Sequence, residues 1–202
     1  MNDRLYLLKI ELLDIEPKIW RRFVVPGSIT LDRLHDVIQI VMGWQDYHLH
    51  EFVIGKMKYT ENPEGKDDGE VDGLFRLVDL VKQKGRNIRY LYDFGDSWEH
   101  EITIEDSRCS HPQLQAPVEC LDGARACPPE DVGGTDGFFD FCEAVLDPAN
   151  EDHEQLTQWY AGFPWYTGAF IPEAYDVAKV NDELMKYLRW SRERSLTWEV
   201  AQ

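Results

Sequence analysis

Two short stretches of the chain bring together the side-chain types that bind cations. Residues 92–100 read YDFGDSWEH and contain two Asp, one Glu and one His. Residues 48–50 read HLH, which places two imidazoles two positions apart. Successive side chains of a strand alternate between its faces, so a strand over 47–55 would present His48 and His50 on the same face. Two imidazoles in this arrangement can bind one metal ion.

The stretch 87–105 is predicted to form a β-hairpin with one aromatic face. Its even-numbered positions from Ile88 to Ile104 are mostly apolar or aromatic, and its odd-numbered positions are mostly polar. His100 belongs to the even set, so we expect it to point toward the core. It is then either a third metal ligand beside His48 and His50 or a hydrogen-bonded core histidine.

The loop of this hairpin decides which side chains face each other. A three-residue loop over 95–97 would pair Phe94 with Trp98 and keep the apolar residues on one face. In that register Asp93 lies opposite Glu99, where like charges destabilise the pair unless solvent, a proton or a cation screens them.

A third stretch, PPEDVGGTDG at 128–137, combines carboxylates with a Gly-Gly pair. Gly133 and Gly134 permit unusual backbone angles ahead of a helix that we expect Asp136 to cap. Free N–H groups at such a helix start could bind an anion. Glu130 and Asp131 would repel a bare phosphate unless a metal ion lay between them. A structured turn with self-capping carboxylates is the alternative.

These stretches define one candidate site and its chemistry. A divalent metal ion would be held by the imidazoles together with carboxylates from these stretches, and one remaining carboxylate would act as a general base. The candidate metal ligands are His48, His50 and His100. The candidate catalytic carboxylates are Asp93, Asp96, Glu130 and Asp131.

The elements that must position this site indicate an α+β fold. Strands are expected in the first half of the chain and helices in the last third, as an antiparallel or mixed sheet with helices packed on one face. One domain over residues 1–202 is expected. Strands are predicted at 4–15, 18–26 and 47–55, with the hairpin at 87–105. Helices are predicted at 31–42 between Thr30 and Gly43, and at 76–85, 138–146, 154–162 and 180–194, the last capped by Asn181. Residues 106–137 are expected to be irregular.

The charge distribution restricts the possible partners. The formal net charge is −17, and residues 91–160 carry 17 acids against two basic residues, Arg108 and Arg125. Such a surface repels nucleic-acid backbones and attracts cations or a basic protein partner, or it serves solubility alone. The chain shows neither a long apolar run nor a basic leader, so a cytoplasmic protein outside the membrane is expected.

The four cysteines are expected to be reduced thiols. They lie at 109, 120, 127 and 142, without the close pairs of a structural zinc site. A zinc site built from Cys109, His111, Cys120 and Cys127 is the alternative.

Three segments together resemble the plasmid pRiA open-reading-frame-three-like family. They read IWRRFVVPGSITLDRLHDVIQIVMGWQDYHLHEF, YLYDFGDSWEHEI and ACPPEDVGG, and the resemblance extends over residues 4–190. It implies an α+β fold and a bacterial or archaeal cytoplasmic protein, encoded on plasmids or as a passenger of insertion elements, without a defined activity. The family pattern falls on Trp20, Arg21, His48, His50, Asp93, Phe94, Gly95, Asp96, Trp98, His100, Pro129, Glu130, Asp131, Gly133 and Gly134.

Three functions follow from these observations. The first is a binding or regulatory module that engages a basic protein partner through its acidic 91–160 region, with Trp20, Trp98, Trp159 and Trp165 at the contact. The candidate binding residues are Trp20, Arg21, Trp98, Gly133 and Gly134. The second is a metal-dependent hydrolase or phosphate-handling enzyme. Direct DNA binding is the third, and the overall charge opposes it. The resolvase label given to some such passengers also fits poorly, because Ser97 lies among acids rather than beside several Arg.

Overall fold

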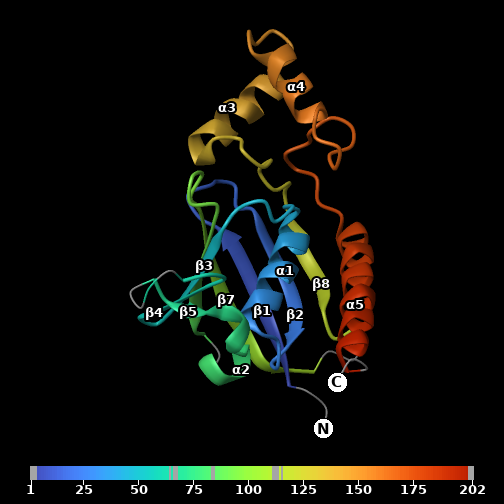
Figure 1. Ribbon diagram of the computed structural model, residues 1–202. Helices are drawn as coiled ribbons and strands as arrows, with labels where there is room; N and C mark the ends of the chain where they lie inside the picture. Colours follow the sequence, from blue (N-terminus) through green and yellow to red (C-terminus); the bar gives the residue numbers. More distant parts are fainter. Residues whose placement is uncertain are drawn as a thin grey trace.

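The protein is described by a computed structural model that covers residues 4–63, 65, 68–82, 85–110, 114 and 116–199, with side chains as far as residue 189. Its centre is an eight-stranded sheet in the order β5-β4-β3-β6-β7-β1-β2-β8 (Figure 1). All neighbouring strands are antiparallel except β4 and β5, which are parallel. The strands are β1 Leu5–Leu12, β2 Trp20–Pro26, β3 His50–Ile54, β4 Met57–Thr60, β5 Glu70–Val71, β6 Asn87–Tyr92, β7 Trp98–Cys109 and β8 Glu119–Ala124.

One face of this sheet carries the core. Strand β1 alternates strictly between half-buried and buried residues, and Tyr6, Leu8, Ile10 and Leu12 have no exposed surface. Burying an aliphatic side chain of this size contributes about 1.5–3 kcal/mol. The opposite face is polar and carries the ion pairs Lys9–Glu11 and Arg22–Glu105. The alternation therefore explains why helices cover one side of the sheet.

Helix α1, Leu31–Met42, covers the apolar face (Figure 1). Its buried stripe includes Leu31, Leu34 and Ile38, which recur at helical spacing. It ends at Gly43, whose φ of 114° is the left-handed conformation that glycine adopts without steric cost. The predicted boundaries at Thr30 and Gly43 are confirmed, although the Thr30 side chain makes no capping hydrogen bond.

The other helices lie mainly in the last third of the chain, as predicted. They are α2 Leu77–Leu80, α3 Gly134–Leu146, α4 His153–Ala161 and α5 Val177–Glu199, with a 3-10 turn η1 at Asp72–Leu74. Helix α5 packs beside β8 and α1, whereas α3 and α4 project beyond the end of the sheet (Figure 1). The α+β fold class is therefore confirmed.

The hairpin differs from its predicted register by two residues. Tyr92 pairs with Trp98 and Tyr90 pairs with His100, so the loop contains the five residues 93–97. The predicted Phe94–Trp98 pair and the Asp93–Glu99 pair are wrong. Glu99 lies opposite Leu91, and Phe94 is exposed in the loop. A shift of two residues preserves the alternation, so the even-numbered strand residues still face the core.

Three local predictions are also corrected. Residues 106–137 are not all irregular, because β7 extends to Cys109 and β8 adds an edge strand to β2. Helix α3 begins after Gly133, not after Asp136. Asn181 is not a cap: it lies inside α5 and holds that helix to β8 through hydrogen bonds with the backbone N–H and C=O of Cys120.

No helix in the described part of the chain is both long and apolar enough to cross a membrane.

Candidate functional site

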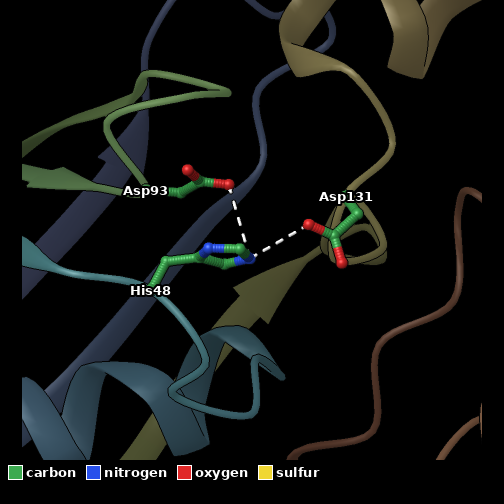
Figure 2. Close-up of side chains that lie close together, drawn as sticks. All are labelled: His48, Asp93 and Asp131. Carbon is green, nitrogen blue, oxygen red and sulfur yellow. Dashed lines mark ion pairs between the residues drawn. The ribbon is translucent and has the colours of Figure 1, made fainter.

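Three side chains from three separate segments converge at one end of the sheet. His48 Nε2 lies 3.1 Å from Asp131 Oδ1 and 3.6 Å from Asp93 Oδ2 (Figure 2). One ligand atom from each residue lies within 4.8 Å of the other two. The His48 Nε2 atom is buried and has no hydrogen bond of acceptable geometry to a described residue. Asp131 is 61% exposed, so the cluster opens to solvent on that side.

The hairpin loop fixes the position of Asp93. Its φ of 56° is left-handed, a conformation in which Asp is enriched among residues other than glycine. The Asp93 carboxylate accepts the Gly95 N–H at 2.8 Å, and the Asp93 carbonyl accepts the Ser97 N–H at 2.7 Å. Only 9% of the Asp93 side chain is exposed. The loop therefore holds this carboxylate at the sheet end rather than on the solvated outer face.

The loop that carries Asp131 is tied to the same hairpin. Asp131 is also left-handed, with φ of 57°. The Asp96 carboxylate at the hairpin tip accepts the Gly133 N–H at 3.0 Å. A Cβ at Gly134 would come within 2.9 Å of the Asp96 carbonyl oxygen, so only glycine permits this close approach. The Gly133 N–H, which was predicted to bind an anion, therefore already donates to a carboxylate of the protein.

Side-chain acceptors also fix the segment before His48. The N–H of Gln45 donates to Glu130 Oε1 at 2.7 Å, and the N–H of Tyr47 donates to the Tyr92 hydroxyl at 3.1 Å. Between them, the N–H of Asp46 donates to the Gln39 side-chain oxygen at 3.0 Å. Three consecutive backbone donors thus bind side chains of other elements. His48 follows this segment as a pre-positioned residue rather than as part of β3.

Glu130 is a buried carboxyl beside the cluster. Its side chain is 1% exposed, and its Oε2 lies 3.9 Å from His48 Nε2. Burial raises the pKa of Glu130, although the Gln45 N–H and the Tyr92 hydroxyl oppose this effect by hydrogen bonding to its charged form. A carboxyl whose pKa is raised toward neutrality is suited to accept and release a proton.

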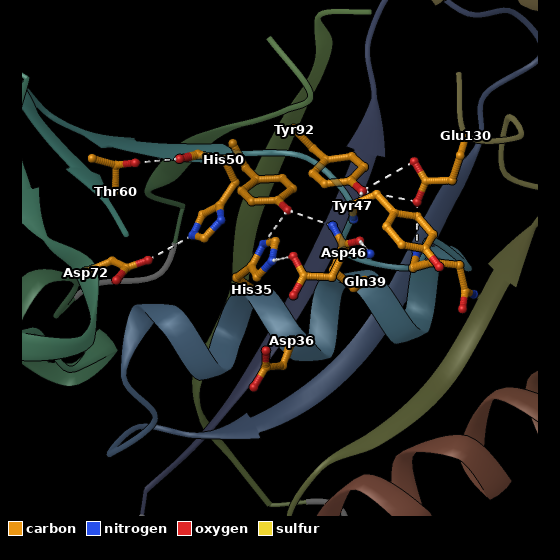
Figure 3. A network of polar contacts seen from close by, with 12 residues as sticks. His35, Asp36, Gln39, Asp46, Tyr47, His50, Thr60, Asp72, Tyr92 and Glu130 are labelled. Atoms are coloured by element: carbon orange, nitrogen blue, oxygen red, sulfur yellow. Dashed lines mark hydrogen bonds and ion pairs between the residues drawn. The ribbon is translucent and has the colours of Figure 1, made fainter. Parts of the chain in front are cut away.

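A second polar network lies deeper, between α1 and β3 (Figure 3). The rings of His35 and His50 stack with centroids 3.6 Å apart and planes inclined by 10°. His50 Nε2 contacts the buried Asp72 carboxylate at 2.8 Å, and His35 Nε2 contacts Asp46 at 2.8 Å. His35 Nδ1 lies 2.7 Å from the Tyr90 hydroxyl. Each imidazole therefore already has a carboxylate partner.

The hydrogen bonds around Tyr90 and His35 link α1 to β6. The side-chain oxygen of Gln39 accepts the Asp46 N–H, so its amide nitrogen donates to the Tyr90 hydroxyl at 3.1 Å. His35 Nε2 faces the Asp46 carboxylate, which can only accept, so this nitrogen carries the proton of that hydrogen bond. The same hydrogen bond lowers the pKa of Asp46.

The predicted set of three imidazole ligands is separated in the structure. His48 joins Asp93 and Asp131, whereas His50 is engaged by Asp72. His100 faces the core, as predicted, and has no exposed surface. Its Nδ1 lies 3.2 Å from the Tyr90 carbonyl, and burial lowers its pKa to about 3, so the ring is neutral. The structure thus gives His50 and the Nδ1 of His100 local partners, and of these three histidines it brings only His48 to Asp93 and Asp131.

The predicted binding residues also occupy different environments. Arg21 and Trp98 are buried, which differs from the exposed positions expected of contact residues. The Arg21 guanidinium donates to the carbonyls of Val41 and Ala124 at 2.7 Å each. Trp20 is half-buried on the polar face of the sheet, with Lys9 and Arg22 over its ring. Gly133 and Gly134 join the candidate site through Asp96.

The described residues give no support to the zinc site built from cysteines. All four thiols are free, and none joins a cluster of potential ligands there. His111, the histidine of that alternative, lies outside the described residues.

The sequence pattern did not mark His35, Asp46 or Asp72 as members of a polar network. The spacing contains a signal for His35, because it falls one position after Leu34 within the buried stripe of α1. Asp72 lies in a Gly- and Asp-rich segment whose composition is typical of a surface loop. No periodic pattern there predicts burial, although only 2% of Asp72 is exposed.

Comparison with known proteins places the chain in a family. Residues 4–180 match the family model described as plasmid pRiA4b ORF-3-like protein. The chain is 38% identical over 192 residues to the uncharacterized protein y4hQ of Sinorhizobium fredii, covering 93% of this chain and 96% of that protein. A crystal structure of the protein of unknown function MM3350 from Methanosarcina mazei superposes with a TM-score of 0.73 at 33% identity, covering 89% of this chain and 98% of that one. The chain therefore belongs to the plasmid pRiA4b ORF-3-like family.

Proposed function

We propose that this protein binds a divalent cation at His48, Asp93 and Asp131 and uses it to hydrolyse a phosphate ester. The convergence of one imidazole and two carboxylates within 4.8 Å carries this proposal. A nitrogen ligand with two carboxylate ligands suits Mn²⁺ or Zn²⁺, and three protein ligands leave coordination positions for water and substrate.

The arrangement around the three ligands supports a catalytic use. A bound cation would supply a more acidic water and neutralise a substrate phosphate at a surface rich in carboxylates. Glu130 Oε2 faces the same imidazole nitrogen, and the raised pKa of Glu130 suits it to take the proton of the attacking water. Asp96 would not bind the cation; it holds the two loops together through Gly133.

Cation binding is tested by thermal unfolding of the purified chain with and without Mn²⁺ or Zn²⁺. A ligand at about 100 times its dissociation constant stabilises the folded state by about 2.7 kcal/mol. We expect His48→Ala and Asp131→Asn to abolish this shift. Asp140→Asn is the matched control, because it removes an exposed carboxylate of α3 outside the cluster. An unchanged shift in both ligand variants would exclude this site.

Hydrolysis is tested separately with p-nitrophenyl phosphate in the presence of the cation. We expect Glu130→Gln to retain the thermal shift and to lower turnover by about 10²–10⁴-fold, as for the loss of a general base. Cation binding without cation-dependent turnover would contradict the proposed hydrolase activity and support the cation site alone.

A second function, an acidic docking surface for a basic protein, is favoured by one observation. Residues 134–161, which include α3 and α4, contain seven exposed acids and no Lys or Arg. Helix α4 buries none of its residues. We expect a Lys-rich probe peptide to bind at low salt and to lose affinity when Asp140, Glu143 and Asp147 are replaced by their amides. Equal binding by that variant would exclude this surface.

A further inference from the structure

A cleft of about 910 Å³ lies between the end of α1, the segment after β8 and the start of α5. This volume is in the range of about 300–1,000 Å³ that is typical of small-molecule sites. His48, Asp93 and Asp131 do not line it. The cleft is therefore a separate feature from the cation site, although Gln45 and Tyr166 from its wall hydrogen-bond to Glu130.

Aromatic side chains dominate the chemistry of the cleft wall. Trp44, Trp165, Tyr166 and Tyr175 all line it. Trp165 and Tyr166 are half-buried, so their rings retain exposed surface, whereas Trp44 is 3% exposed. Trp165 is braced by Tyr47 at 5.3 Å and by Phe163 at 5.2 Å between ring centroids. Rings held in this way are suited to stack on a flat ligand.

Arg21 places a buried positive charge at the wall of the cleft. Tyr175 lies over the Arg21 guanidinium at 3.8 Å from its ring centroid. Arg21 is satisfied by backbone carbonyls, and no carboxylate of the described chain pairs with it. A Cβ at Gly123 would lie 2.4 Å from the Tyr175 ring, so glycine at this position of β8 makes room for the ring.

The acids at the cleft are already engaged. Glu173 pairs with Arg125 at 2.9 Å, and Glu183 pairs with Lys186 at 2.7 Å. Asp176 accepts the N–H groups of Ala178 and Lys179 at the start of α5. By contrast, the exposed ammonium of Lys179 lies within 4.0 Å of no carboxylate of the described chain. Each of the three acids of the lining therefore has a partner, and Arg21 is hydrogen-bonded to backbone carbonyls, which leaves Lys179 available to an anion.

We propose that the cleft binds a planar aromatic molecule that carries one anionic group, with the ring against Trp165 and Tyr166 and the anion toward Lys179. The cleft binds this molecule without covalent thiol chemistry. Burial raises the pKa of the Cys127 thiol well above its ordinary value, so the thiol at the cleft wall stays protonated at neutral pH.

Two probe ligands with the same ring test the proposal by isothermal titration calorimetry on the whole chain. We expect 2-naphthoate to bind, and 2-naphthamide, which lacks the charge, to bind about tenfold more weakly. Lys179→Gln should weaken 2-naphthoate by a similar factor and leave 2-naphthamide unchanged. Lys56→Gln, at an exposed lysine between β3 and β4 and far from β8 in the strand order, is the matched control and should change neither.

Equal affinity for the two probes, or an unchanged affinity of Lys179→Gln for 2-naphthoate, would overturn the charge assignment. Absence of binding by either probe would overturn the cleft as a site for aromatic anions. Trp165→Leu should weaken both probes, which identifies the stacking surface. If circular dichroism shows that the Trp165 variant does not fold, the Lys179 variant still decides the proposal. The Lys179 side chain is exposed, so its replacement should leave the fold unchanged.

Discussion

His48 and His50 are two residues apart, yet they occupy opposite kinds of environment. His50 lies on β3, is 4% exposed, stacks on His35 and contacts a buried carboxylate. His48 lies before the strand, with an unsatisfied Nε2 among carboxylates of two loops. His35 and His50 have local partners and stabilise the fold, whereas His48 has the geometry of a ligand. Spacing alone does not distinguish these roles; the partners of each nitrogen do.

The sharpest test of this contrast is to remove each histidine in turn. His50→Ala leaves the Asp72 carboxylate buried without its partner, and we expect a loss of about 3–5 kcal/mol in the free energy of unfolding. His48→Ala should cost about 1 kcal/mol or less, because its side chain is 27% exposed and its Nε2 makes no hydrogen bond to a described residue. Urea denaturation measures both. Equal losses would show that the two histidines do not differ in this way.

Two glycines with nearly equal φ test the contact between the hairpin loop 93–97 and the loop that carries Asp131. Gly134 has φ of +69° and faces the Asp96 carbonyl, whereas Gly55 has φ of +68° and open space. Gly55→Ala should cost about 1–2 kcal/mol from backbone strain alone. Gly134→Ala should cost about 2–3 kcal/mol and also weaken cation binding, since the loops must separate. A Gly134 variant with the same cost as the Gly55 variant and intact cation binding would contradict this contact.

The smallest expected effects are two pH dependences of opposite sign. Burial raises the pKa of Glu130, so its contribution to stability is present below its unfolded pKa and is lost as pH rises through its folded pKa. The hydrogen bond from His35 lowers the pKa of Asp46, so that contribution is present above its unfolded pKa and is lost as pH falls.

Glu130→Gln should therefore flatten the decline of stability toward high pH, and Asp46→Asn should flatten the decline toward low pH. Urea midpoints from about pH 3 to about pH 8 measure both slopes. If Glu130→Gln instead steepened the decline at high pH, the carboxyl would not be destabilised by its burial.

Most of the sheet could be predicted because its signal is alternation. The even-numbered set in 87–105 gave the correct inward face, but parity cannot distinguish a three-residue loop from a five-residue loop. That ambiguity produced the wrong partner for Asp93. Strand β8 was missed because Gly123 and the polar residues around it lack an alternating pattern. The carboxylates of the candidate site were identified by residue type, whereas their assembly around His48 depends on contacts between loops.

The docking of Asp96 onto the Gly133–Gly134 turn has a consequence for natural and engineered variation. Surface hairpin tips usually accept added or deleted residues, because lengthening a loop changes its closure entropy little. Here one extra residue in 93–97 would displace the carboxylate that Gly133 binds and the carbonyl that Gly134 touches. Length changes in this tip should survive only when the facing turn changes with it, so the two segments should vary as one unit among relatives.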